Sequence, residues 1–267
     1  MTQKTRLDAL LVSRGDFADT DSAAKAILAG MVTSPKRGSL KPGMLVSPSD
    51  EFKVKERRQF VSRGGIKLAH ALQTFAISVE GLRCIDIGAG SGGFTDCLLQ
   101  NGAKAVTAVD VGYGQFDWKL RQDVRVELFE RTNFLSLVPS KLSKVFDLAV
   151  VDLSFTKTSN LLRQISSFLK PDGQMLVLVK PQFELKSELA SPPGFVRGVV
   201  HDKSLHRVVL EGFIDQAASV GLVTKGLVLS PIKGADGNTE FLFWATLKGL
   251  PANIDIPSLV EQISHTV

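Results

Sequence analysis

The sequence predicts an α/β protein built on a doubly wound, mostly parallel, Rossmann-like sheet of seven strands, with a small α+β domain at its N-terminus. From residue 82 onward, short apolar segments alternate with helical patterns, as in successive βαβ units. A glycine-rich turn follows the first of these apolar segments. The first quarter of the chain differs, because it combines two short helical patterns with small strand-like segments and holds all of the excess positive charge.

The N-terminal region is expected to form two helices followed by short strands. Apolar residues at helical spacing predict a helix over 6–14 that Gly15 ends. Thr20-Asp21-Ser22 is suited to cap a second helix over 23–29. Short apolar or alternating segments predict strands at 31–32, 45–46 and 51–55.

Charge divides the chain near the same place. Residues 1–66 hold 12 Lys and Arg against 7 Asp and Glu, whereas residues 67–267 hold 20 of each, so the net charge of +5 lies in the first quarter. This excess suits a nucleic-acid-binding module and an ordinary solvated surface equally well. We expect a basic domain over 1–60, joined by a linker at about 56–62 to a larger, neutral domain.

The basic domain contains a recognisable residue pattern. Its elements are Arg6-Leu7-Asp8, Leu11, Arg14-Gly15, Ser22-x-x-Lys25-x-Ile27 and Gly30-x-Val32. The pattern resembles the RNA-binding module first named for small-subunit ribosomal protein four; an unrelated helical hairpin is the alternative. The resemblance implies two helices that present a basic face to structured RNA. The expected RNA contacts are Arg6, Arg14, Lys25, Lys36 and Arg37.

The larger domain is expected over 61–250, and 251–267 as a C-terminal tail. A first helix is predicted from Ser62 to about residue 75. Strands are then predicted at 82–87, 104–110, 125–129, 146–152, 174–180, 226–230 and 240–247. Helices between them are predicted at 94–100, 159–169 and 201–218. Ligands of such a sheet bind at the carboxyl ends of its strands.

The general composition is that of a globular protein. No apolar run approaches the length that spans a membrane, and the N-terminus lacks the apolar centre of a signal peptide, so we expect a cytoplasmic protein. The two cysteines, Cys84 and Cys97, are expected to be core residues rather than a disulfide. Two cysteines also exclude a zinc site of the multi-cysteine type.

The glycine-rich turn, 85–94, predicts a nucleotide-type pocket. Gly88, Gly90 and Gly93 fit the dinucleotide fingerprint G-x-G-x-x-G. However, Asp86 would repel a pyrophosphate, whereas it suits the ammonium group of S-adenosylmethionine (SAM), which has no phosphate. The turn therefore favours SAM; an NAD site of an oxidoreductase and a plain glycine-rich loop are the alternatives. The expected cofactor contacts here are Asp86, Gly88, Gly90, Gly92, Gly93 and Phe94.

Polar residues at the ends of later strands extend this pocket. Asp110 follows Gly93 by 17 residues, about where an acid accepts hydrogen bonds from a ribose diol. An exposed charge at a strand end is the alternative. Asn133, after the third strand, could meet the adenine edge, and Asp152 ends the fourth strand beside the cofactor.

Lys180 follows five apolar residues and precedes a proline. A lysine that emerges from a buried strand is costly unless it is paired or functional. A neutral amine is a base, but an adjacent acid such as Asp152 would rather orient the ammonium. A purely structural ion pair between Lys180 and Asp152 is the alternative.

Five segments occur in order along the larger domain: Ser62-Arg63-Gly64-Gly65-Ile66-Lys67-Leu68, the turn from Asp86 to Thr95, Val151-Asp152-Leu153-Ser154-Phe155, Val179-Lys180-Pro181-Gln182-Phe183-Glu184 and Asn238-Thr239-Glu240-Phe241. Together they resemble the TlyA (hemolysin A) family across essentially the whole chain. The resemblance implies an FtsJ-like methyltransferase that uses SAM to methylate ribose 2′-hydroxyls of ribosomal RNA, usually on cytidine. It also adds Arg63 to the expected RNA contacts.

The same resemblance implies a catalytic tetrad of Lys67, Asp152, Lys180 and Glu240. Lys180 is then the base or the stabiliser of the alkoxide, Asp152 and Glu240 orient it and the hydroxyl, and Lys67 holds the nucleotide. The expected partners are ribosomal RNA or ribosomal subunits, without a metal or a membrane. A membrane-active haemolysin, suggested by the family's older name, is the further alternative, but it requires an amphipathic or spanning element that the sequence lacks.

Overall fold

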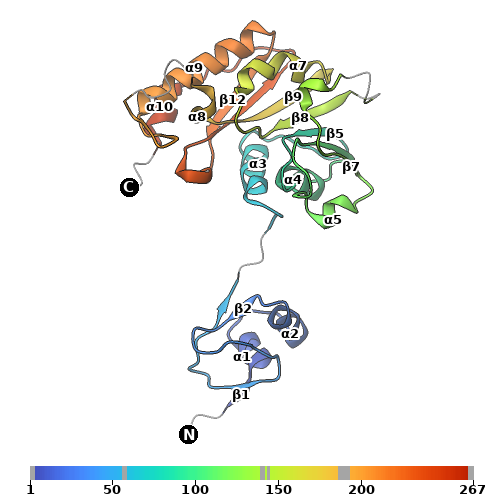
Figure 1. Cartoon of the computed structure of the whole chain (residues 1–267), viewed down its shortest axis with the longest axis vertical. Coiled ribbons are helices and arrows are strands. Elements are labelled where there is room, and N and C mark those ends of the chain that lie inside the picture. The colour runs from blue at the N-terminus through green and yellow to red at the C-terminus, as the bar shows by residue number, and fades with distance from the viewer. Residues whose placement is uncertain (1–3, 56–58, 139–141, 143–144, 186–192, 264–267) are drawn as a thin grey trace. The chain divides into compact units, whose positions relative to one another are not determined.

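The computed structural model describes residues 4–55, 59–138, 142, 145–185 and 193–263. The chain forms two compact units, Met1–Arg58 and Gln59–Val267 (Figure 1). Each unit has its own hydrophobic core.

The N-terminal unit is a small α+β fold. Two helices, α1 (Leu7–Ser13) and α2 (Thr20–Leu28), pack on each other through buried leucines, alanines and Ile27. The strands form two antiparallel pairs: β1 (Thr5–Arg6) with β3 (Leu45–Val46), and β2 (Val32–Thr33) with β4 (Lys53–Val54). The expected cap of α2 is wrong by one residue. Asp19 caps the helix, because its carboxylate accepts a hydrogen bond of 2.7 Å from the amide of Ser22.

The larger unit contains the predicted seven-stranded, mostly parallel sheet, in the order β12-β13-β9-β8-β5-β6-β7. Its strands are β5 (Arg83–Ile87), β6 (Ala105–Val109), β7 (Val126–Phe129), β8 (Phe146–Val151), β9 (Leu169–Val179), β12 (Val223–Leu229) and β13 (Phe241–Thr246). Only β13 runs against its neighbours, since it pairs antiparallel with both β9 and β12. The sheet confirms the predicted fold class.

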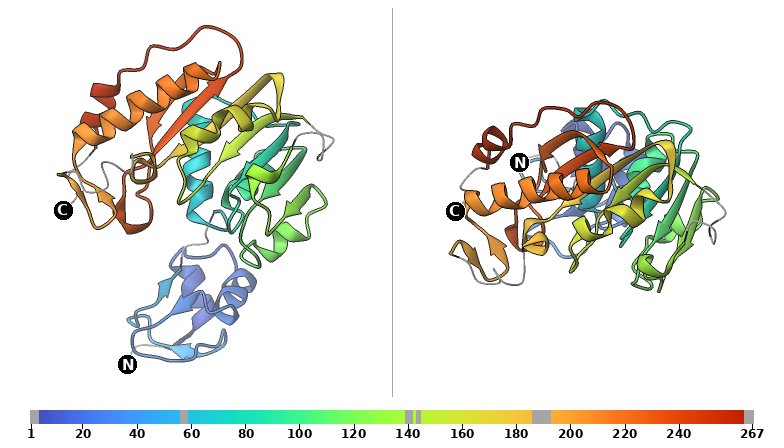
Figure 2. Two further views of the ribbon diagram at one scale, coloured as in Figure 1. Left: turned by 45° about the horizontal axis from the view of Figure 1, so that its top comes forward. Right: turned by 90° about the horizontal axis from the view of Figure 1, so that it is seen from above.

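Helices cover both faces of this sheet (Figure 2). One face packs on α3 (Arg63–Thr74) and α4 (Gly93–Gln100), and the other on α7 (Leu162–Ser166), α9 (Lys203–Ser219) and α10 (Ile256–Glu261). Strand alternation explains the two cores. On β5, for example, Cys84 belongs to the first core, whereas Ile85 and Ile87 belong to the second.

Shorter elements join the strands near the carboxyl edge of the sheet. They are α5 (Trp118–Arg121), η1 (Phe134–Ser136), η2 (Thr158–Leu161), α8 (Pro181–Glu184), η4 (Ala235–Gly237) and a hairpin of β10 (Phe195–Val196) and β11 (Val199–Val200). The helix expected over 159–169 is thus a 3₁₀ turn followed by the short α7, and β9 begins at Leu169.

Two further expectations have clear outcomes. Cys84 and Cys97 are free and buried, and burial raises the pKa of each thiol to about 12. The segment expected as a tail includes α10, whose Ile256, Leu259 and Val260 are buried in the core against α9. Across the described ranges, the helices are all too short or too polar to cross a membrane.

Candidate active site

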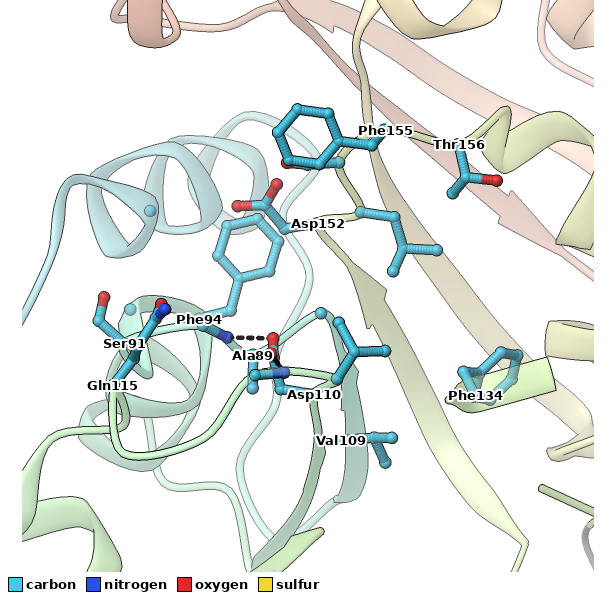
Figure 3. Close-up of a pocket in the computed structure, with 18 of the residues that line it drawn as sticks. Ala89, Ser91, Phe94, Val109, Asp110, Gln115, Phe134, Asp152, Phe155 and Thr156 are labelled. Carbon is cyan, nitrogen blue, oxygen red and sulfur yellow. Dashed lines mark hydrogen bonds between the residues drawn. The ribbon is translucent and has the colours of Figure 1, made fainter. Parts of the chain in front are cut away.

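A cavity of about 660 Å³ lies at the carboxyl ends of β5, β6, β8 and β9 (Figure 3). It is the place where the doubly wound sheet is expected to bind a ligand. Of the residues predicted to contact the cofactor or substrate, the cavity wall includes Lys67, Gly88, Gly90, Gly93, Phe94, Asp110, Asn133, Asp152 and Lys180. The structure therefore brings together most of a site that the sequence spreads over more than 100 residues.

The turn after β5 requires glycine at two positions for different reasons. Gly88 has a φ of 85°, and a Cβ there would lie 2.4 Å from the carbonyl oxygen of Asp152. The turn consequently packs directly against the end of β8. Gly90 has a φ of 52°, but a Cβ there would meet only the Gly88 oxygen at 4.0 Å. At Gly90 it is the left-handed backbone that disfavours a side chain, and the neighbouring space is open.

Asp86 and Gly92 are not part of the cavity wall. The Asp86 side chain is fully buried beneath the turn, where its Oδ2 accepts a hydrogen bond of 2.7 Å from the Thr95 hydroxyl. Burial raises the pKa of Asp86 to about 7, and its Oδ1 has no hydrogen-bond partner in the described part of the chain. A Cβ at Gly92 would collide with Leu120, 2.5 Å away. These two residues shape the turn from behind.

Asp110 links the glycine turn to the loop after β6. Its Oδ2 accepts a hydrogen bond of 2.7 Å from the amide of Gly90, and its Oδ1 accepts one of 2.6 Å from the amide of Gly112. Each oxygen keeps a second lone pair for a hydroxyl of a ligand. Asn133 also reaches the cavity, but its side-chain oxygen caps η1 by accepting from the amide of Leu135 at 2.9 Å.

The chemistry of this cavity fits an adenosyl cofactor without phosphates. Backbone of the glycine turn and the Asp110 carboxylate form one part of the wall, and the apolar side chains of Val109, Phe134 and Leu161 form another. The described cations of the wall are Lys67 and Lys180, two of the four residues predicted to be catalytic. The amide of Gly90 already donates to Asp110, so the turn has fewer free backbone donors for a pyrophosphate, which supports SAM over a dinucleotide.

The four predicted catalytic residues form two ion pairs. Lys180 Nζ lies 2.6 Å from Asp152 Oδ1 and also donates a hydrogen bond of 2.9 Å to the hydroxyl of Ser154. Lys67 pairs with Glu240, and both of these side chains are at most 10% exposed. Both lysines face the cavity, whereas Glu240 does not line it and holds Lys67 from behind. The residues come from α3, the ends of β8 and β9, and the start of β13.

The segment before β13 is built to bury Glu240. A Cβ at Gly234 would lie 2.3 Å from Glu240 Oε1, so a larger residue there would displace the carboxylate. Asn238, which is 2% exposed, holds the same segment through its side-chain amide. Arg63 donates a hydrogen bond of 2.6 Å to the carbonyl oxygen of Lys233 and thereby ties α3 to this segment. An expected RNA contact thus has a structural partner.

Sequence reasoning missed the roles of two residues, of which Phe155 lines the cavity and Glu184 does not. Phe155 is a cavity residue with a φ of 64° and is 92% exposed, and its ring lies 5.3 Å from that of Phe183. Glu184 Oε1 accepts hydrogen bonds from the amides of Thr158 (2.7 Å) and Ser159 (3.3 Å). Both residues stand in the motifs that predicted the family. Nothing in one sequence indicates that an aromatic residue is exposed or that an acid caps a distant turn.

Several predicted RNA contacts in the N-terminal unit have partners within that unit. Arg6 pairs with Asp8 at 2.7 Å, and Arg37 pairs with Asp50 at 2.8 Å. Arg14 donates to the carbonyl oxygens of Pro48 and Asp50 at 2.6 and 2.8 Å. Lys25 and Lys36 are exposed, and their ammonium groups have no ion-pair partner in the described part of the unit.

Comparison with known proteins identifies the family of the larger unit. The profile of the FtsJ-like methyltransferases matches residues 60–247. The chain is 40% identical over 246 residues to the 16S/23S rRNA (cytidine-2'-O)-methyltransferase TlyA of Mycobacterium tuberculosis, covering 91% of this chain and 90% of that relative. It is 36% identical to Hemolysin A of Brachyspira hyodysenteriae, covering 89% of this chain and 98% of the relative.

A solved structure from Streptococcus thermophilus, described there as a hemolysin, is 40% identical with a TM-score of 0.72 and covers 98% of this chain and 96% of its own. The match to methyltransferases overturns the interpretation of the glycine turn as an NAD site of an oxidoreductase. The chain therefore belongs to the FtsJ-like methyltransferase family, in the group of the TlyA and hemolysin A proteins.

Proposed function

We propose that this protein transfers the methyl group of SAM to a ribose 2′-hydroxyl of ribosomal RNA, on cytidine. The observation that carries the proposal is the pair of lysines, Lys67 and Lys180, each bound to a carboxylate and each facing the cavity beside the glycine turn. The activity named for the M. tuberculosis relative agrees with this chemistry. With ribosomal RNA as its substrate, the protein would act in the cytoplasm.

Bound SAM would supply an activated methyl group. The turn from Gly88 to Gly93 would lie along it, Asp110 would accept hydrogen bonds from its ribose diol, and Phe134 would pack against its adenine. Asp86 would act from below, by holding the turn through Thr95 and the start of α4.

Lys180 would act on the attacking hydroxyl. A lysine is ordinarily protonated at neutral pH, and the carboxylate of Asp152 at 2.6 Å attracts that charge. The ammonium would orient the hydroxyl and stabilise the oxyanion as it forms. The ion pair could also take up the leaving proton as a unit: Lys180 accepts it while its own proton moves to Asp152. The bond from oxygen to the methyl carbon forms as the bond from carbon to sulfur breaks.

Lys67 would add a second positive charge to the same cavity. Its buried pairing with Glu240 fixes the direction of the ammonium, because both side chains are almost completely enclosed. Phe155, which is exposed beside these groups, offers a flat surface on which a base could stack. Each of these residues would position the nucleotide, so that the hydroxyl is in line with the sulfur.

The N-terminal unit would supply affinity for structured RNA. Among its predicted RNA contacts, Lys25 and Lys36 are exposed and have no ion-pair partner in the described part of the unit, and Arg6, Arg14 and Arg37 retain further donors beyond their internal partners. Deletion of residues 1–58 should weaken RNA binding and flatten its salt dependence, with little change in SAM affinity. Equal RNA affinity of the truncated and full-length proteins would contradict this division of labour.

The proposed function is tested by methyl transfer from labelled SAM to isolated ribosomal subunits and to protein-free ribosomal RNA. We expect one or a few 2′-O-methylated cytidines, mapped by their resistance to alkaline cleavage. Transfer to a base atom, or to protein, would contradict the proposal while leaving the methyltransferase family intact.

A further inference from the structure

The hairpin of β10 and β11 carries an arginine at an unusual backbone position. Its strands pair Phe195 with Val200 and Val196 with Val199, so Arg197 and Gly198 alone form the turn. Their φ angles are 51° and 80°, both in the left-handed region that a tight hairpin turn requires. Asparagine, aspartate or glycine is favoured at the first of these positions, and arginine is disfavoured there. Backbone strain of this kind motivates the hypothesis that the side chain has a function.

The turn is fixed to the segment that positions Glu240. The side-chain nitrogen of Asn238 donates a hydrogen bond of 2.9 Å to the carbonyl oxygen of Gly198, and its oxygen accepts one of 3.1 Å from the amide of Val200. Asn238 is 2% exposed and precedes Glu240 by two residues. Arg197 therefore lies in a hairpin turn that Asn238 holds against the segment leading to Glu240, a member of one of the two proposed catalytic ion pairs.

The hairpin also contacts the element that carries the second ion pair. β11 packs beside α8, and Lys180 is the residue that caps the N-terminus of α8. The hairpin that carries Arg197 thus contacts both segments that hold the proposed catalytic residues.

The guanidinium of Arg197 has no partner in the described part of the chain. Arg197 is exposed, and none of the described acids pairs with it or accepts a hydrogen bond from it. Lys67 and Lys180, in contrast, are both bound to carboxylates. A free, planar guanidinium presents a fork of donors that matches a phosphate in two-point contact.

We infer that Arg197 binds a backbone phosphate of the RNA strand that enters the active site, next to the nucleotide to be methylated. This inference rests on the proposed function, since it assigns the hairpin a role in holding the same substrate. The contact fixes the register of the strand, and the chemistry stays with the ion pairs. The contact between Arg197 and the phosphate therefore contributes to RNA binding rather than to the methyl transfer step.

The turn chemistry provides a sharp test. Arg197→Asn removes the guanidinium and creates Asn-Gly, the pair that this turn favours, so the hairpin should be kept or stabilised. We expect the KM and the Kd for ribosomal RNA to rise about 5- to 10-fold, with kcat at saturating RNA within about twofold and SAM affinity unchanged. The slope of log Kd against log salt concentration should fall by about one, which corresponds to the loss of one phosphate contact.

Lys104→Asn is the matched control, because Lys104 is exposed, has no ion-pair partner among the described residues and directly precedes β6, at the amino end of that strand. Wild-type RNA affinity and salt slope in Arg197→Asn, or an equal change in the control, would overturn the inference. Failure of the wild-type protein to methylate RNA would instead count against the proposed function, and direct RNA binding would still decide the role of Arg197.

Discussion

Lys180 and Asp152 form an ion pair of 2.6 Å across the carboxyl ends of two neighbouring strands, β9 and β8. The same two strands carry a second pair at their other end, where Lys170 lies 2.5 Å from Asp147. The first pair faces the cavity, and the second does not. The two pairs are alike in chemistry and differ in location, so the second is a natural control for the first.

Lys180→Ala should abolish methyl transfer while SAM still binds, because the proposed role of the lysine is to act on the hydroxyl and not on the cofactor. We expect kcat to fall by at least about 100-fold, the usual effect of losing such a group. Lys180→Arg should also fail, because a guanidinium neither releases a proton nor reproduces the compact charge of an ammonium. Transfer from labelled SAM and calorimetric SAM affinity are the two measurements. Lys170→Ala should leave both unchanged, and near-normal turnover of a folded Lys180→Ala protein would rule out the proposed role.

Gly90→Val should block the cofactor. The substitution places a branched side chain at the cavity wall and on a backbone with a φ of 52°. Gly114→Val is the matched control, since Gly114 has a φ of 76° and open space around it but does not line the cavity. We expect SAM affinity to fall at least tenfold in the first variant and to stay unchanged in the second. Equal affinity in both variants would remove Gly90 from the cofactor site.

Asp86 should make the stability of the protein fall as the pH rises. Its pKa is raised to about 7 in the folded protein because of burial, whereas an aspartate in an unfolded chain has a pKa of about 4. Between these values the unfolded chain releases the proton and the folded protein keeps it, so the stabilisation is complete below pH 4 and is lost through pH 7. The loss is roughly 4 kcal/mol, at about 1.4 kcal/mol for each unit of pKa shift.

Asp86→Asn removes this titration while keeping an oxygen for the Thr95 hydroxyl. Urea unfolding at pH 5 and pH 8 measures the difference. The free energy of unfolding of the wild type should be lower at pH 8 than at pH 5 because Asp86 titrates. This difference should be smaller in the variant, whatever the variant's absolute stability. Parallel pH dependence in the two proteins would show that Asp86 titrates normally.

The sequence predicts much of this fold because its signals are local. The alternation of apolar strands with helices, and the glycines that only a tight turn needs, are enough to place β5, β6, β8 and β9 and the turn that follows β5. Local sequence signals are a weaker guide to the direction in which a side chain points. Asp86 has a residue type that often contacts ligands. However, strand alternation directs its side chain to the face of the sheet covered by α4, where it is buried. The strand ends already suggest that Lys180 meets Asp152, but Lys67 and Glu240 are 173 residues apart, and only the family resemblance brings these two into one site.

Glu184 should position the two segments that follow β8 and β9, which carry Asp152 and Lys180. It closes α8, which Lys180 caps, and its Oε1 accepts hydrogen bonds from the amides of Thr158 and Ser159 in the loop after β8. It therefore fixes the distance between the two loops that carry Lys180 and Asp152. Glu184→Ala leaves two buried or half-buried amides without their acceptor, at a cost of roughly 1–3 kcal/mol. We expect a lower melting temperature and a kcat reduced about tenfold, with SAM affinity within about twofold.

Glu184→Gln retains an oxygen that can accept both hydrogen bonds, and it removes a charge that burial disfavours, since burial raises the pKa of the Glu184 carboxyl. It should restore most of kcat. Asp147→Ala is the control for a purely structural effect, because Asp147 also accepts a backbone hydrogen bond, 2.8 Å from the amide of Arg83, but at the far edge of the sheet. It should lower the melting temperature and leave kcat unchanged. If Glu184→Gln is as slow as Glu184→Ala, or if Asp147→Ala is equally slow, the role of Glu184 in positioning the two loops is wrong.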